Sequence, residues 1–203
     1  MKQLLLTGFE PFLDFSTNPT YQIVNDLDGK EIHGFQIIGN ILSVDFKKSG
    51  KQMLSILDKY YPDAVISLGL AAGRDCVNLE RIAINCNDGP VDNSGFKPDG
   101  EVIFPDGQDG YFSTLPIKHI VSELQKEGFP AKISNTAGAY LCNNVMYHAL
   151  YYFHRHGRMI PSGFIHLPAS HKLAIEKNMP SWSEDDLQHA VWVSIRSLVS
   201  YLD

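Results

Sequence analysis

The fold is decided by the stretch Ala131-Lys-Ile-Ser-Asn-Thr-Ala-Gly-Ala-Tyr-Leu-Cys142-Asn-Asn-Val-Met-Tyr-His-Ala-Leu150. Residues 131–135 predict a short strand with a polar end, and residues 137–139 are small enough for a tight turn. From Cys142 onward the spacing is helical, with one apolar stripe formed by Val145, Met146, Ala149, Leu150 and Phe153. Cys142 is therefore expected where a strand is followed by the N-terminus of a helix.

A cysteine in that place has two interpretations. Free backbone N–H groups and the positive end of the helix dipole gather at a helix N-terminus, which lowers the pKa of a cysteine and stabilises a thiolate. The same N–H groups can hold a developing oxyanion. Alternatively, Cys142 is a small buried side chain in a packed turn, as free cysteines often are.

Size and composition predict one globular domain spanning residues 1–203, with 44% hydrophobic and 20% charged residues. The net charge is -6 and no stripe of lysine and arginine is present, so a nucleic-acid partner is not expected. No apolar run approaches the ~18 residues of a membrane span, and the first residues lack the pattern of a signal peptide. Three cysteines without disulfide-framework spacing favour a reducing cytoplasm.

Strands and helices are predicted to alternate along the chain. Apolar runs predict strands over residues 4–7, 34–43, 64–70, 77–85, 131–135 and 163–167. Helical spacing predicts helices over residues 19–27, 46–60, 117–127 and 185–202, besides the one that begins at Cys142. Residues 87–110 are rich in Gly, Pro, Asp and Asn and predict a long functional or mobile loop. This order indicates an α/β fold, with a largely parallel sheet between helix layers.

In such folds the site lies where the strands end, so the residues at the strand ends are the candidates. They include Phe9 and Phe12 after the first strand, Cys142, and His166 in the 163–167 strand, with Glu80 on an additional strand. A cysteine hydrolase needs a nucleophilic sulfur, a histidine that accepts and returns the proton, and an acceptor that orients the imidazole. Cys142, His166 and Glu80 supply these three groups.

Each candidate also has a structural interpretation. His166 lies in an apolar strand and is possible as a hydrogen-bonded core residue, and Glu80 is possible as an ion-pair partner of the adjacent Arg81. Cys76 and Cys86 are expected to be packing residues. A metal site is not expected, because the chain has no CxxC or HxxxH pair.

Several long motifs, in the same order along nearly the whole chain, resemble the type I pyroglutamyl peptidases, also called pyrrolidone-carboxylate peptidases. These cysteine peptidases remove N-terminal pyroglutamate from peptides. The motifs are Thr7-Gly-Phe-Glu-Pro-Phe12, Asn18-Pro19, Leu68-Gly-Leu-Ala-Ala-Gly-Arg74, Leu79-Glu-Arg-Ile-Ala-Ile-Asn85, Asn135-Thr-Ala-Gly-Ala-Tyr-Leu-Cys-Asn143 and Gly163-Phe-Ile-His-Leu-Pro168.

The resemblance implies a three-layer α/β/α sandwich with a largely parallel, partly mixed sheet, no cofactor, and a homo-oligomer such as a tetramer or dimer. Its substrates would be peptides with an N-terminal pyroglutamate. It also implies site residues: a triad of Glu80, Cys142 and His166; aromatic walls from Phe9 and Phe12 around the lactam ring; lactam-binding backbone at Leu70 and Leu141; and Asn18 as a tie for the first loop.

Two positions depart from the family pattern. The segment Asn87-Asp-Gly-Pro-Val-Asp-Asn93 is one residue shorter than the family's and lacks its arginine, and Leu70 stands where a polar residue is common. Neither position touches the triad, but both belong to the expected pocket wall. Two alternatives therefore remain: a cysteine amidase acting on another small cyclic acyl amide, and a non-catalytic small-ligand binder that keeps the three residues.

Overall fold

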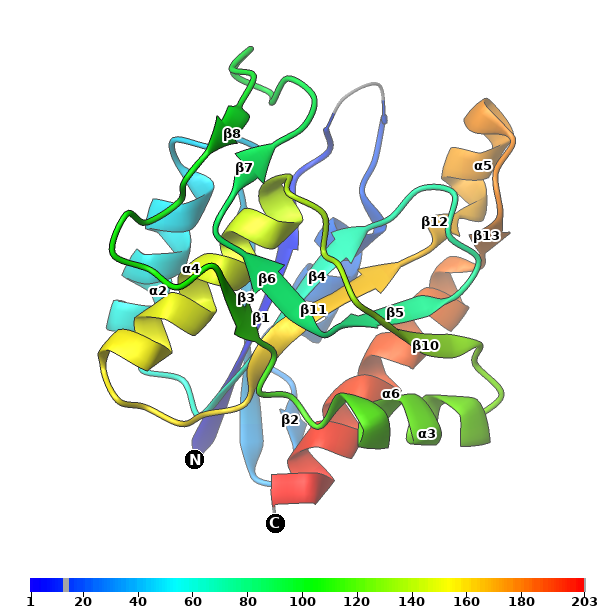
Figure 1. Cartoon of the computed structure of the whole chain (residues 1–203). Helices are drawn as coiled ribbons and strands as arrows, with labels where there is room; N and C mark the ends of the chain where they lie inside the picture. The colour runs from blue at the N-terminus through cyan, green and yellow to red at the C-terminus, as the bar shows by residue number, and fades with distance from the viewer. Residues whose placement is uncertain (13–14, 203) are drawn as a thin grey trace.

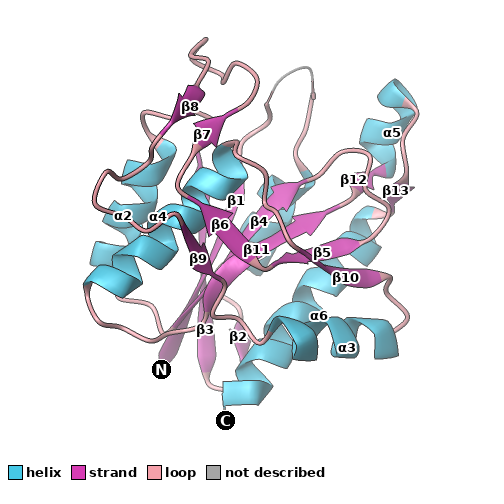
Figure 2. Cartoon of the chain, viewed as in Figure 1, coloured by secondary structure: helices cyan, strands magenta, loops and turns pink. Residues whose placement is uncertain are grey.

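The computed structural model describes residues 1–12 and 15–202. Within them, a seven-stranded sheet lies between two layers of helices, and its strand order is β10-β5-β11-β4-β1-β3-β2 (Figures 1 and 2). The predicted three-layer α/β/α sandwich is confirmed. The strands of this sheet are β1 (Lys2–Phe9), β2 (Glu31–Ile32), β3 (Phe35–Leu42), β4 (Ala64–Leu70), β5 (Val77–Glu80), β10 (Ala131–Ser134) and β11 (Ser162–Leu167).

The sheet is mixed. Strands β3, β1, β4 and β11 are parallel, whereas β5 runs antiparallel to β11 and carries the parallel β10 on its outer side. The predicted 131–135 strand therefore runs opposite to β4 and β11 and does not end at their edge of the sheet. Residues 135–140 return across the front of the sheet and enter the next helix at that edge (Figure 1).

The two faces of the sheet bury separate cores. Leu4 and Leu6 of β1 pack with one helix layer, formed by α1 (Pro19–Leu27), α3 (Ile117–Lys126) and α6 (Glu184–Leu202). Leu5 and Phe9 face the other layer, formed by α2 (Ser49–Tyr60) and α4 (Leu141–Arg155). Burial on both faces explains why the central strands are continuous apolar runs. The predicted stripe of α4, Val145, Met146, Ala149, Leu150 and Phe153, is buried as expected.

Helix starts follow local chemistry. Asn18 caps α1 through its side chain, and Pro19 occupies the first turn, as predicted. Helix α2 begins at Ser49 rather than at Phe46. The Asp45 side chain accepts a hydrogen bond from the Lys47 N–H at 2.8 Å, and residues 46–48 form a turn before the helix.

The segments between the main elements contain short strands that the sequence pattern did not predict. The 77–85 strand is two strands, β5 and β6 (Ile82–Ile84), and β6 pairs with β9 (Gly110–Phe112). The expected loop 87–110 contains a two-stranded ribbon of β7 (Asn87–Asp88) and β8 (Asp99–Glu101). Before α6 lie β12 (Ala169–Ser170), α5 (His171–Lys177) and β13 (Ser181–Trp182).

None of the helices in the described ranges is both long and apolar enough to cross a membrane.

Helices α2 and α4 approach closely where Gly50 faces the ring of His148, and a Cβ at Gly50 would overlap that ring. We expect Gly50→Ala to lower the free energy of unfolding by about 1–3 kcal/mol, because the overlap forces the helices apart. Urea titration measures this. In a His148→Ala background the same substitution is expected to be neutral or stabilising, because alanine is the better helix former. An equal loss in both backgrounds would contradict the close-packing explanation.

Candidate active site

Cys142 lies in the first turn of α4, which begins at Leu141 after Tyr140. Tyr140 provides no side-chain cap, so the first N–H groups of the helix have no acceptor from a capping side chain. The Cys142 sulfur rests against the backbone of Gly69. A Cβ built on Gly69 would lie 2.8 Å from this sulfur and 2.7 Å from the Phe164 ring. Only a residue without a side chain leaves room for the sulfur at this point of β4.

His166 lies on the same face of the sheet. It is the direct neighbour of Gly69 across the parallel pair of β4 and β11. Phe164 and His166 are two residues apart, so their side chains point to one face, and their rings are 4.9 Å apart. The His166 side chain is almost fully buried. The imidazole and the Cys142 sulfur therefore both lie beside Gly69, although they come from β11 and α4.

Glu80 reaches His166 from the antiparallel strand β5. Its Oε1 lies 2.7 Å from Nδ1 of His166 and accepts a hydrogen bond from Nη1 of Arg74 at 2.8 Å. Glu80 is fully buried. Burial by itself raises the pKa of this carboxyl, but the hydrogen bond and charge of His166, together with Ser134 and Arg74, hold the pKa below its ordinary value.

The alternative ion pair of Glu80 with Arg81 is wrong. Nε of Arg81 donates to Oδ1 of Asn135 at 2.7 Å, and the arginine on Glu80 is Arg74. The sequence pattern did not single out Arg74. The available signal was its position at the end of the glycine-containing motif between β4 and β5, where a turn can bring it back to the strand ends.

The expected low pKa of Cys142 is also wrong. Burial, and then the negative charge of Glu80, raise the pKa of the thiol to about 12, although Arg74 and the backbone N–H of Cys142 act in the opposite direction. The cost of desolvating a thiolate therefore outweighs the stabilisation that the N–H groups at the start of the helix provide. A sulfur in this position requires a base beside it before it can attack.

A narrow apolar slot adjoins the sulfur. The sequence-predicted substrate-binding residues Phe9, Phe12, Asn18, Leu70 and Leu141 all line it. The structure adds Val44 and Tyr140, which the sequence pattern did not indicate. The slot encloses only about 20 Å³, which is room for about one water molecule. A five-membered ring is therefore larger than the free volume of the slot in this conformation.

Two asparagines hold the loop that carries Phe12. Oδ1 of Asn18 accepts the Thr20 N–H at 3.1 Å, and its Nδ2 donates to the Glu10 carbonyl at 3.2 Å. Nδ2 of Asn93 donates to the Pro11 carbonyl at 2.9 Å. From the same 87–93 segment, the carbonyl of Val91 accepts the hydroxyl of Tyr140 at 3.1 Å. The segment that departs from the family pattern is thus bonded to the walls of the slot.

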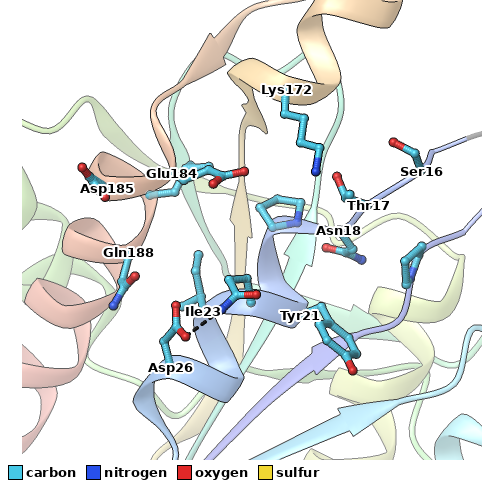
Figure 3. A pocket seen from close by; sticks show the side chains of 14 residues that line it. Ser16, Thr17, Asn18, Tyr21, Ile23, Asp26, Lys172, Glu184, Asp185 and Gln188 are labelled. Carbon is cyan, nitrogen blue, oxygen red and sulfur yellow. Dashed lines mark hydrogen bonds between the residues drawn. The ribbon is translucent and has the colours of Figure 1, made fainter.

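A larger cavity of about 630 Å³ lies between α1, α5 and α6 (Figure 3). Asn18 lines both this cavity and the slot, and none of Glu80, Cys142 and His166 lines the larger one. The volume of a cavity alone therefore does not identify the candidate active site. Among residues 1–12 and 15–202, no cluster of three His, Cys, Asp or Glu side chains is arranged to hold a metal ion.

A sulfur at a helix start, an imidazole on the same face and a buried carboxylate on the imidazole are the groups of a cysteine hydrolase. The family model described as pyroglutamyl peptidase matches residues 2–201. The chain therefore belongs to the pyroglutamyl peptidase family.

Relatives agree with this family. The chain is 58% identical over 198 residues to a pyrrolidone-carboxylate peptidase of Oceanobacillus iheyensis, covering 98% of this chain and 100% of the relative. It is 51% identical over 200 residues to that of Lysinibacillus sphaericus, covering 98% of each. The solved structure of a mutant pyrrolidone carboxyl peptidase from Pyrococcus furiosus is 42% identical, with a TM-score of 0.96 and coverage of 99% and 100%.

The contact at Gly69 generates a prediction. Gly69→Ala should lower kcat/KM by about 100-fold, because the new methyl group displaces the sulfur by a distance on the scale of an ångström. Steady-state assays with a pyroglutamyl amide, together with circular dichroism to check folding, measure this. Ala72→Ser adds one atom to the exposed turn after β4 and is expected to leave kcat/KM unchanged. A folded Gly69→Ala variant with full activity would contradict the tight placement of the sulfur.

Proposed function

We propose that this chain removes N-terminal pyroglutamate from peptides with Cys142 as the nucleophile, and that residues 1–203 act as one peptidase domain. Membership of the pyroglutamyl peptidase family supports the reaction. One observation carries the roles of the residues: the 2.7 Å contact between Oε1 of Glu80 and Nδ1 of His166, on the sheet face that holds the Cys142 sulfur.

In this proposal Glu80 fixes the tautomer of His166. An ionised carboxylate only accepts hydrogen bonds, so Nδ1 carries the proton and Nε2 is left as the basic nitrogen. Nε2 then takes the thiol proton as the Cys142 sulfur attacks the pyroglutamyl carbonyl. Because the thiol pKa is raised, proton transfer accompanies the attack, and the sulfur need not rest as a thiolate.

The remaining steps follow acyl-transfer chemistry. The carbonyl oxygen becomes an oxyanion, which backbone N–H groups in the first turn of α4 stabilise. His166 returns its proton to the leaving amine as the C–N bond breaks, and the pyroglutamyl group stays on Cys142 as a thioester. A water molecule, deprotonated by His166, then hydrolyses the thioester and releases free pyroglutamate and the thiol.

The slot provides the selectivity. Phe9 and Phe12 offer apolar walls that suit an uncharged lactam ring, and they disfavour a free N-terminal glutamate, whose charges would lose water without replacement. Leu70 and Leu141 also line the slot, and in this proposal their backbone groups bind the lactam amide. In this proposal Phe12 is the wall of the slot that contacts the lactam ring from the loop after β1.

We also propose a cytoplasmic location and assembly as a homo-oligomer, a dimer or a tetramer. Cys76, Cys86 and Cys142 are free thiols, which suits a reducing compartment. Phe112 and Met159 expose 66% and 98% of their surface, and they line one shallow apolar hollow that a second copy could cover. Analytical ultracentrifugation measures the number of copies in solution.

The nucleophile is tested by Cys142→Ala, which should lower turnover of a chromogenic pyroglutamyl amide by about 10⁴-fold or more while the fold is kept. The matched control is Cys86→Ala, another partly buried cysteine, with unchanged turnover expected. Retained activity in Cys142→Ala would overturn the assignment.

The same substrate separates the alternatives for the intact chain. Turnover supports the peptidase. Binding without turnover would indicate the non-catalytic binder, and neither binding nor turnover would favour an amidase for a different cyclic acyl group.

The aromatic wall is tested by Phe12→Ala. We expect KM to rise roughly 10-fold with a smaller change in kcat, because the ring loses apolar contact that is worth about 1–2 kcal/mol. Steady-state kinetics separate the two constants. Phe112→Ala removes an exposed phenylalanine that does not line the slot and should leave KM unchanged. An unaltered KM in Phe12→Ala would remove Phe12 from the binding site.

A further inference from the structure

Both side-chain contacts of the Glu80 carboxylate, to His166 and to Arg74, are made by one of its two oxygens. Oε1 is shared by Nδ1 of His166 at 2.7 Å and Nη1 of Arg74 at 2.8 Å. Oε2 is buried and has no partner within hydrogen-bond distance in the described part of the chain. The hydroxyl of Ser134 lies near enough to help lower the pKa of the carboxyl, but it donates its hydrogen bond to the Thr136 carbonyl at 3.1 Å. The cation and the imidazole therefore compete for the same negative atom.

The Arg74 side chain is partly exposed to solvent, unlike the carboxylate that it contacts. It lies in the turn between β4 and β5, and 31% of its side-chain surface is exposed, whereas the Glu80 side chain is fully buried. A purely structural counter-ion for a buried carboxylate would be expected to bond the free oxygen as well, since an arginine can bind both oxygens at once. Arg74 instead meets Glu80 at the oxygen that holds the ring.

We propose that Arg74 is a positioning residue for the reaction: by sharing Oε1 of Glu80 with His166, its fixed positive charge sets the pH range in which the Cys142–His166 pair works. This inference rests on the proposed function, because it assigns Arg74 an indirect role at the same sulfur and imidazole. Arg74 does not contact the reacting atoms. It acts through the carboxylate and through its charge near the sulfur.

The sign of the effect follows from electrostatics. A nearby positive charge makes it harder to add a proton and easier to remove one, so Arg74 acts in one direction on the Cys142–His166 pair as a whole. The effect of Arg74 on the pKa of Cys142 has this direction. Removing the charge therefore has the opposite effect on the pair. Whichever group limits the acid side of the pH–rate profile and whichever limits the alkaline side, both limbs move to higher pH.

Other ionisable groups around the pair are accounted for. Tyr140, before α4, has a pKa that burial raises to about 12, so it stays neutral over the working range. Asp75 and Lys132 flank the turn and β10, are exposed, and lie 3.9 Å apart as an opposite-charge pair. Among the charged groups named here, Arg74, in the turn before β5, is the one that contacts Glu80 besides His166.

The test compares Arg74→Gln with Arg74→Lys. Gln keeps hydrogen-bond donors and removes the charge, and both limbs of the kcat/KM profile for a pyroglutamyl amide should shift up by about 0.5–1 pH unit. Lys keeps the charge and should restore the wild-type limbs. Arg81→Gln is the matched control: it removes a neighbouring charge that bonds Asn135 instead of Glu80, and unshifted limbs are expected.

A second readout does not depend on turnover. The rate at which iodoacetamide alkylates Cys142, followed by peptide mass spectrometry as a function of pH, should show the same upward shift in Arg74→Gln. If the wild-type chain showed no turnover, the proposed function would be overturned, but the alkylation rates of the wild-type and Arg74→Gln chains could still be compared. Unshifted alkylation and pH–rate profiles in a folded Arg74→Gln variant, or equal shifts in the Gln and Lys variants, would overturn the role of Arg74.

Discussion

A buried carboxylate is the constraint on which the candidate site depends. Glu80 has no exposure to water, and a charge in such a place is tolerated only when cations and hydrogen-bond donors surround it. Arg74 and His166 meet this requirement, and each comes from a different part of the chain. The direct pairing of β5 with β11 makes the meeting possible, because it brings Glu80 onto the same sheet face as the ring of His166.

The buried carboxylate also fixes the position of the imidazole relative to the Cys142 sulfur. The ring of His166, held by Glu80, lies beside Gly69 on the sheet face that carries the Cys142 sulfur. Gly69 permits the sulfur to approach by having no side chain of its own. The site thus combines a strongly polar contact, between Glu80 and His166, with the space that Gly69 leaves for the sulfur. His166 and Gly69 lie on the neighbouring strands β11 and β4.

Much of the fold could be predicted from the sequence because its signals are local. Runs such as 64–70 are apolar on both faces, Asn18 and Pro19 mark a helix start, and the stripe after Cys142 has helical spacing. The direction of β10 could not be predicted, since strand direction depends on which neighbours pair across the sheet. The ribbon within 87–110 was missed because its strands are only two and three residues long.

The site shows the same division between local and distant information. The residue types of the triad could be singled out from strand ends and motif resemblance. The partner of Glu80 could not: Arg81 is adjacent in sequence, but alternation along the chain turns it toward Asn135. The pKa of Cys142 also escaped prediction, because the helix start is visible in the sequence whereas the extent of burial depends on the packed structure.

The bonds of Asn93 to Pro11 and of Tyr140 to Val91 have an evolutionary consequence. They make the 87–93 segment a brace behind the slot. The same segment also bonds the start of α4, because Asn87 accepts a hydrogen bond from Asn144 at 2.9 Å and the Asp88 N–H donates to the Ala139 carbonyl at 2.9 Å. An insertion, deletion or exchange in this brace would therefore act both on the width of the slot and on the helix that carries Cys142.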